Sequence, residues 1–126
     1  MIEFGSGVSI VCIKEIEKRL KHSRKAFIEK TFTRREVQYC SNKRNSAEHF
    51  AARLAAKEAC LRALGLTVQP NLFRRIEVVR KPSGQPTLDL DVSIFGDSIW
   101  KEAQCDLSMA HERDAAIAFV LFSRAT

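Results

Sequence analysis

The spacing of hydrophobic residues divides the first third of the chain into one extended and two helical segments. Residues 7–13 (GVSIVCI) are apolar and β-branched, which predicts a buried strand. Residues 14–28 place apolar side chains at helical spacing among many charges, which predicts an amphipathic helix. Thr33 is followed three residues later by Glu36, a capping-box pattern that predicts a short helix over residues 34–40.

The remaining pattern predicts a long helix and several strands. Residues 46–64 form an alanine-rich helical segment that ends at Gly65, a residue typical of helix C-termini. Residues 75–79 and 87–92 alternate apolar and polar side chains around a Pro- and Gly-containing turn at 81–86, which predicts a hairpin. A short helix is expected over 96–103, and strands over 106–108 and 115–122. We therefore expect one domain, residues 1–126, of the α+β class, with an antiparallel sheet packed on a long helix.

Composition and charge narrow the class of protein. The 126 residues are 45% hydrophobic and 29% charged, as in an ordinary globular domain, and the net charge of +6 favours an acidic partner or substrate. Four widely spaced cysteines show no metal-finger spacing, which favours reduced thiols and a cytoplasmic location. The first residues lack a signal-peptide pattern and no apolar stretch has the length of a membrane span, so we expect no membrane association.

The helix expected over residues 46–64 carries the most informative charges. Arg53, Lys57 and Arg62 recur at steps of four and five residues, which predicts a basic flank, and Glu58 lies at its edge. A carboxylate beside several cations suits a site for a metal ion and a polyphosphate. Taken alone, the helix fits equally an amphipathic helix with a solvated charged face. His111 is expected in a polar turn before the last strand, where a histidine is more often structural than functional.

Five segments in this order resemble one enzyme family. They read GSGVSIV (5–11), FTRREVQYC (32–40), FAARLAAKEA (50–59), the turn GQP (84–86), and SMAH followed by AIAFV (108–120). Together they resemble the holo-acyl-carrier-protein synthases, the small bacterial type of 4′-phosphopantetheinyl transferase. The resemblance covers nearly the whole chain, and the Lys-Glu helix with its upstream arginine is its most specific part.

The resemblance implies a transfer of phosphopantetheine from coenzyme A to a serine of an apo-acyl carrier protein, with Mg²⁺ and release of adenosine 3′,5′-bisphosphate. It implies that Glu58 binds the metal and accepts the serine proton, and that Lys57 stabilises the pyrophosphate. Arg53 matches the arginine for the coenzyme's 3′-phosphate. Arg62 replaces a family lysine, and His111 matches a histidine near the pyrophosphate.

The same resemblance exposes departures from the family pattern. The turn formed by Ser83, Gly84, Gln85 and Pro86 is expected at the nucleotide end, where Gln85 replaces a lysine. Ser9 stands where the family has a metal-binding aspartate, and a hydroxyl is a much poorer Mg²⁺ ligand. Ala110, before the histidine, is a milder change. Either Glu58, phosphates and water hold the metal more weakly, or another carboxylate substitutes, or the chain is an inactive homologue that only binds coenzyme A or carrier protein.

The predicted first helix suggests the protein partner. Residues 14–25 have a net charge of +4, from a set of cations that includes Lys14, Lys18, Lys21, Arg24 and Lys25. Acyl carrier proteins are acidic, so this helix is expected to steer the carrier; the alternative is a solvated helix without a partner. No nucleic-acid motif is present, which disfavours DNA or RNA binding. The resemblance further implies a homotrimer with sites between subunits, Glu58 and Lys57 from one chain facing Ser9 and His111 of its neighbour.

Overall fold

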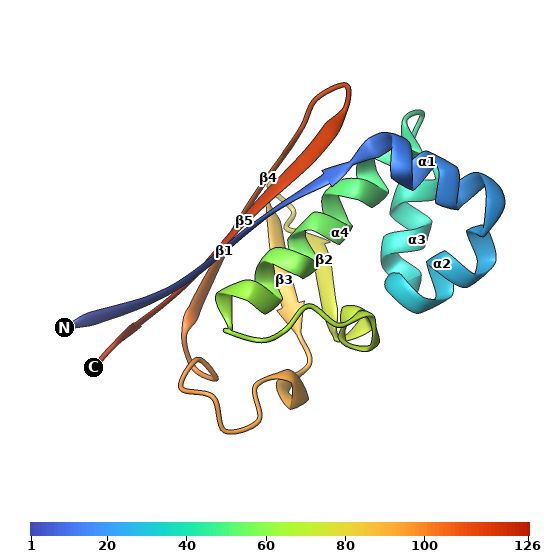
Figure 1. The fold of residues 1–126 in the computed structure, drawn as a ribbon. Coiled ribbons are helices and arrows are strands. Elements are labelled where there is room, and N and C mark those ends of the chain that lie inside the picture. Colours follow the sequence, from blue (N-terminus) through green and yellow to red (C-terminus); the bar gives the residue numbers. More distant parts are fainter.

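The computed structural model describes all 126 residues and has a three-stranded antiparallel sheet packed against a helix (Figure 1). The strand order is β1-β5-β4, so the first and last strands pair along their whole length and the two chain ends lie side by side. These elements are β1 (Ile2–Cys12), β4 (Gln104–His111), β5 (Ala115–Ala125) and helix α4 (Ser46–Ala63). The α+β class and the antiparallel sheet expected from the pattern are confirmed.

The sheet and α4 approach each other closely because small residues line their contact. The inward face of β5 carries Ala116 and Ala118, and α4 presents alanines to it. On β1, Gly7 faces the helix: a Cβ there would lie 2.1 Å from the carbonyl oxygen of Ala59. Only glycine allows this approach, and it brings the side chains of β1 and α4 within hydrogen-bonding distance.

Three short helices gather at one end of α4 (Figure 1). They are α1 (Ile13–His22), α2 (Arg24–Thr31) and α3 (Arg34–Ser41). The single helix expected over residues 14–28 is wrong, because the backbone at Ser23 leaves the helical region (φ −140°) and starts a second helix. The capping box of α3 is confirmed: Thr33 accepts from the Glu36 amide, and the Glu36 side chain accepts from the Thr33 amide.

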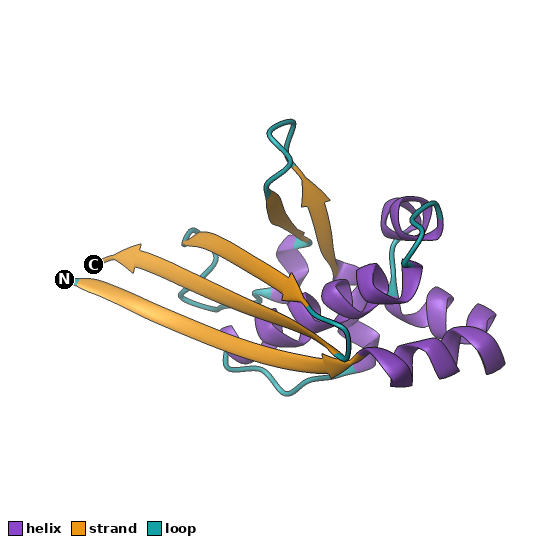
Figure 2. Ribbon diagram, turned by 90° about the horizontal axis from the view of Figure 1, so that it is seen from above, coloured by secondary structure: helices purple, strands orange, loops and turns teal.

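A separate two-stranded hairpin contacts both α4 and the edge strand β4 and projects away from the sheet (Figure 2). It consists of β2 (Ile76–Arg80) and β3 (Pro86–Leu90), preceded by the 3₁₀ helix η1 (Pro70–Arg75) and followed by η2 (Val92–Ile94). The hairpin prediction is confirmed. The helix expected over 96–103 is wrong, since this segment consists of turns that follow η2. No helix has both the length and the apolarity needed to cross a membrane.

Candidate functional site

Ser9 and Glu58 form a polar pair between β1 and α4. The Ser9 side chain is buried, and its Oγ donates a hydrogen bond to Glu58 Oε1 at 2.6 Å. The close approach at Gly7, two residues before Ser9, makes this contact possible. Both residues belong to one chain, so the expectation that Ser9 would face Glu58 across a subunit boundary is wrong. The pair supplies one carboxylate and one neutral hydroxyl.

Arg62 lies one helical turn beyond Glu58 and contacts the same strand. Its Nη1 donates to the Val8 carbonyl oxygen at 2.9 Å, while the side chain remains exposed. Residues four apart on a helix share a face, so Glu58 and Arg62 flank β1 together. The free edge of the guanidinium is available to an anion beside Glu58.

Lys57 is not part of a solvent-facing basic flank, contrary to the sequence prediction. Its side chain and that of Glu36 are both 0% exposed, and their charged atoms lie 2.8 Å apart. Lys57 Nζ also donates to the carbonyl oxygens of Phe73 and Ile76. Burial lowers the pKa of Lys57 below its ordinary value, and the Glu36 carboxylate opposes that shift. All three ammonium protons are used inside the protein, so Lys57 has none left for a pyrophosphate.

Arg53, one turn before Lys57, is also buried, but it lines a cavity. The cavity has a volume of about 340 Å³ and is bounded by His49, Ala52, Arg53, Arg80, Pro86, Met109, Ala110 and His111. Arg53 Nη1 donates to the His49 carbonyl oxygen at 3.2 Å, and its Nε is the one buried side-chain polar atom with no hydrogen-bond partner. A guanidinium that lines a cavity and forms no ion pair is suited to an anionic ligand.

The cavity-lining residues Arg53 and Arg80 belong to a cluster of positive charge around Tyr39. The charged groups of Arg53, Lys43 and Arg80 lie 4.3, 4.5 and 5.4 Å from the centre of the Tyr39 ring, and none of these three residues forms an ion pair. His49 completes the cluster with its ring 5.7 Å from Tyr39. Burial and the neighbouring cations, Arg53 first among them, lower the pKa of His49. Because no carboxylate neutralises the three cations, the cluster favours a multiply charged anion.

His111 is the last residue of β4, rather than part of a turn as predicted. Its Nδ1 lies 3.3 Å from Glu48 Oε2, and its ring lies 5.7 Å from that of His49. The structure therefore brings His111 and Arg53 to one cavity. Pro86 is the only residue of the predicted hairpin turn that lines this cavity. The other three, Ser83, Gly84 and Gln85, are exposed at the tip of the hairpin.

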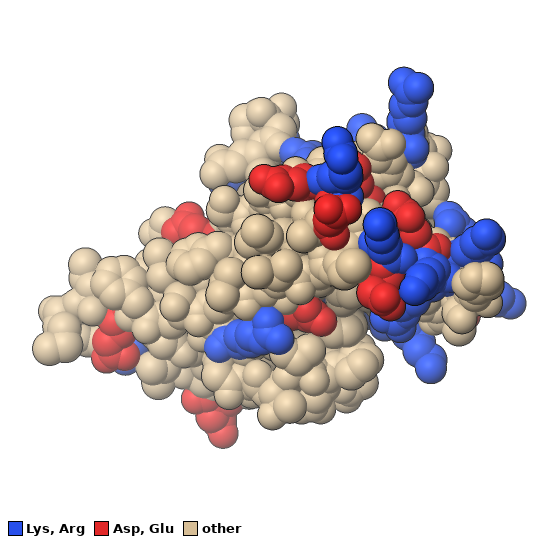
Figure 3. Space-filling model, turned by 45° about the horizontal axis from the view of Figure 1, so that its top comes forward, with Lys and Arg blue, Asp and Glu red and all other residues tan.

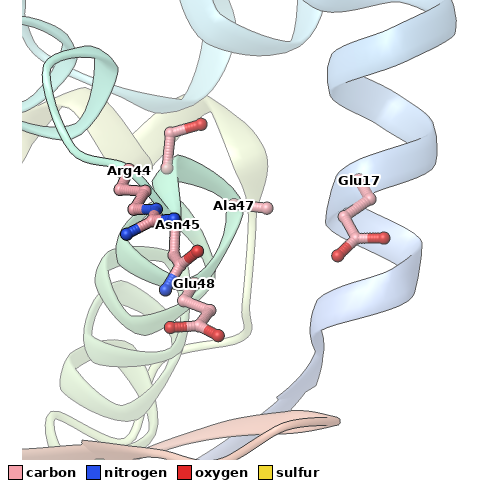
Figure 4. A pocket seen from close by; sticks show the side chains of 6 residues that line it. Glu17, Arg44, Asn45, Ala47 and Glu48 are labelled. Atoms are coloured by element: carbon pink, nitrogen blue, oxygen red, sulfur yellow. The ribbon is translucent and has the colours of Figure 1, made fainter.

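A second, smaller hollow lies next to the Arg53 cavity, and Glu48 lies between the two. It has a volume of about 230 Å³ and is lined by Glu17, Arg44, Asn45, Ser46, Ala47 and Glu48. Glu17 comes from α1 and faces the first turn of α4 across the gap (Figure 4). Because Glu48 lines this hollow and also contacts His111, the hollow adjoins the cavity on the side of α1.

The cations predicted to bind a carrier protein lie on the outside of α1 and α2. Lys14, Lys18, Lys21, Arg24 and Lys25 are all exposed. Figure 3 shows blue side chains gathered over this end of the molecule, whereas the surface over the sheet is largely uncharged. Of this set only Lys18 forms an ion pair, with Glu15 at 3.7 Å.

Sequence reasoning missed His49 and Arg80, which line the cavity, and Tyr39 and Lys43, which belong to the cluster of cations around the Tyr39 ring. A partial signal was present, since His49, Arg53 and Lys57 recur at steps of four and share one face of α4. Nothing in the pattern could place Arg80 of β2 or Tyr39 of α3 beside that face. Their convergence depends on how α3 and the hairpin pack on α4.

No group of three or more His, Cys, Asp or Glu side chains in the chain is close enough to hold a metal ion. The Ser9–Glu58 pair therefore cannot make a complete protein shell. Mg²⁺ commonly takes one or two carboxylates and receives its other oxygens from water and substrate phosphates. The pair fits a metal bound in that way.

Comparison with known proteins identifies relatives over almost the entire chain. The model of the 4′-phosphopantetheinyl transferase superfamily matches residues 5–120. A holo-acyl-carrier-protein synthase of a Geobacter species is 37% identical over 125 residues, covering 96% of this chain and 98% of the relative. That of Syntrophotalea carbinolica is also 37% identical, covering 94% of each.

Solved structures of similar proteins share the fold. The holo-acyl-carrier-protein synthase of Bacillus anthracis in complex with CoA (3′,5′-ADP) has a TM-score of 0.79 and 28% identity, covering 96% of both chains. The Helicobacter pylori enzyme in complex with coenzyme A has a TM-score of 0.77 and 28% identity, covering 93% of this chain and 98% of that one.

Proposed function

The chain belongs to the 4′-phosphopantetheinyl transferase superfamily, and we propose that it transfers the 4′-phosphopantetheine group of coenzyme A to a serine of an apo-acyl carrier protein. The observation that carries this proposal is the cavity lined by Arg53 and Arg80, neither of which forms an ion pair. Coenzyme A carries a pyrophosphate and a 3′-phosphate, which is the kind of polyanion that such a cavity would hold. Arg53, with its free buried Nε, is assigned to the 3′-phosphate.

Glu58 is the proposed base. The carrier serine oxygen forms a bond to the β-phosphorus of the coenzyme, the bond from that phosphorus to the bridging oxygen breaks, and adenosine 3′,5′-bisphosphate leaves. The serine proton passes to the Glu58 carboxylate, which the Ser9 hydroxyl orients. Arg62, on the same face as Glu58, and His111 donate hydrogen bonds to the pyrophosphate.

Glu58 would hold Mg²⁺, with the Ser9 hydroxyl as a weak additional ligand and phosphate oxygens and water as the others. When bound, the ion would neutralise charge that develops on the pyrophosphate. Because Ser9 contributes no charge, we expect weaker metal binding than at a site with two carboxylates. Lys57 has no direct role in this scheme, since its ammonium is already saturated.

We also propose that two copies contribute to each site. Glu58 and Arg53 are five residues apart on α4, so their side chains point about 140° apart around the helix axis. One coenzyme would therefore reach Arg53 and His111 of one chain and Glu58 of another more readily than both sets in one chain. Each site would still be shared between subunits, as expected from the resemblance. One subunit would contribute Ser9 and Glu58, and the other would contribute Arg53 and His111.

The outer face of the sheet supports self-association. Outward side chains of β1 and β5 pair across the strands, Ile10 with Ile117 and Val8 with Phe119, and form an exposed apolar surface. Ile10 is 68% and Phe119 45% exposed, which is unusual for large apolar side chains that lie together. We propose that this surface is the subunit interface, with three copies as the family resemblance implies.

The carrier protein is proposed to dock on α1 and α2, where exposed cations would attract its acidic surface. This activity would serve fatty-acid synthesis in the cytoplasm, where the four free thiols of this chain would remain reduced. An inactive homologue that binds coenzyme A or carrier without transfer is the second candidate, and the single carboxylate of the Ser9–Glu58 pair favours it.

One experiment separates these functions. The protein is incubated with apo-acyl carrier protein, coenzyme A and Mg²⁺, with and without chelator, and the intact mass of the carrier is measured. We expect a metal-dependent gain of the phosphopantetheine mass, which Glu58→Gln abolishes and the exposed control Glu102→Gln retains. Coenzyme binding without any mass gain would establish the inactive homologue, and a fully active Glu58→Gln variant would remove Glu58 from the mechanism.

A further inference from the structure

The buried pair of Glu36 and Lys57 joins four elements that are distant in sequence. Glu36 Oε2 accepts from the Val78 amide of β2 at 2.8 Å, and its Oε1 accepts from the Thr33 amide at the start of α3. Lys57 of α4 binds Glu36 and the carbonyl oxygens of Phe73 and Ile76. The bonds of the pair join α3 to β2, α3 to α4, and α4 to the η1–β2 segment. The pair therefore fixes how these elements lie relative to one another.

Tyr39 and the cavity-lining residues Arg53 and Arg80 lie on the same elements as this pair. Tyr39 is three residues after Glu36 on α3, and Arg53 is four residues before Lys57 on α4. Arg80 is two residues after Val78 on β2. Three and four residues on a helix, or two on a strand, return to the same face. The inner pair and the outer trio of Tyr39, Arg53 and Arg80 therefore form two successive layers between the same three elements.

The pair and Arg53 act on the same buried thiol. Glu36 is a buried carboxylate close enough to Arg53 that both act on the Cys40 thiol, whose pKa burial raises to about 12 while Arg53 opposes and Glu36 adds to the increase. Lys57 neutralises Glu36 at 2.8 Å. Glu36 therefore has Lys57, and not Arg53, as its ion-pair partner.

We propose that Glu36 and Lys57 are positioning residues for recognition of the coenzyme's 3′-phosphate. They hold α3 and β2 against α4 so that Tyr39, Arg53 and Arg80 converge. This inference rests on the proposed function. Lys57 would then affect the affinity for coenzyme A by positioning the residues that line the cavity. It would not contact the reacting phosphate.

The test compares coenzyme A with dephospho-coenzyme A, which lacks the 3′-phosphate. In the double variant Glu36→Leu with Lys57→Met, apolar groups of similar size replace the ion pair, and the Thr33 and Val78 amides lose their carboxylate acceptor. We expect the KM for coenzyme A to rise at least about tenfold, with kcat within about threefold of the parent. The KM for dephospho-coenzyme A should change much less, so the preference of the enzyme for coenzyme A falls. Phe122→Leu, a core change at the far end of the sheet, is the matched control and should leave this preference unchanged.

A stable double variant that keeps the parent's preference for coenzyme A would overturn the proposal and leave the pair a purely structural role. If the double variant does not fold, Glu36→Gln provides the same test, because it keeps the side-chain shape and removes the charge. We expect it to lower the preference for coenzyme A about threefold or more, and an unchanged preference would again overturn the proposal. A parent protein that neither binds nor uses coenzyme A would instead refute the proposed function.

Discussion

Gly7→Ala is the most direct test of how the fold creates the Ser9–Glu58 pair. The new Cβ would lie 2.1 Å from the Ala59 carbonyl oxygen and 2.6 Å from the Ala63 amide nitrogen. Both atoms belong to the backbone of α4 and cannot rotate away, so β1 must move outward by about 1 Å or more to restore ordinary contacts of about 3.4 Å. Overpacking of this kind costs about 1–3 kcal/mol, and we expect the upper part of that range.

The loss of stability converts into a measurable shift of the melting temperature. With an unfolding entropy of about 2.1 cal/mol/K per residue, a chain of 126 residues loses about 4 °C for each kcal/mol. Gly7→Ala should therefore melt about 8–12 °C below the parent. Because the displaced strand carries Ser9 away from Glu58, transfer measured below the melting range should fall about tenfold.

Two further substitutions on β1 calibrate the result. Gly5→Ala places its Cβ 2.7 Å from the Ala63 carbonyl oxygen and otherwise meets the Trp100 side chain, so its effect should be smaller. Ser6→Ala, on the exposed face between the two glycines, should resemble the parent. A Gly7→Ala variant that melts with the parent and transfers normally would show that β1 is not held against α4 as described.

Four other outcomes are expected. Ser9→Asp should let the protein bind Mn²⁺ without coenzyme, measured by electron paramagnetic resonance; an unchanged titration would mean that this position does not face the metal. Charge reversal at Lys18 and Lys21 should weaken carrier binding about tenfold and leave coenzyme affinity unchanged, whereas equal losses would indicate misfolding. Since folding lowers the pKa of His49, the unfolded chain takes up a proton that the folded one resists, and stability should fall as the pH drops below about 6.5. His49→Gln should flatten that decline in urea unfolding at pH 7.5 and 5, and equal slopes would contradict the assignment. Phe119→Glu should lower the mass measured by sedimentation, and an unchanged mass would exclude the outer sheet face as the interface.

Local pattern predicted the elements whose signals are short-range. The capping box at Thr33 and Glu36 and the hairpin around residues 81–86 depend on neighbouring residues, and each occurs as expected. The break at Ser23 was missed because the apolar spacing continues through it. Residues 96–103 were expected to be helical, but they follow the outside of the molecule as turns.

Sequence alone determined the fold class and, through the order of its motifs, the family. Tertiary structure decided which of the predicted site residues can act. Alanines and other apolar residues occur around most of α4, so its pattern did not reveal which flank faces solvent, and Lys57 proved to be buried. The helical period shows which residues share a face of α4. What that face contacts depends on the packing of segments that are far apart in sequence. That packing paired Lys57 with Glu36, left Arg53 open to a cavity, and placed Ser9 beside Glu58 in a single chain.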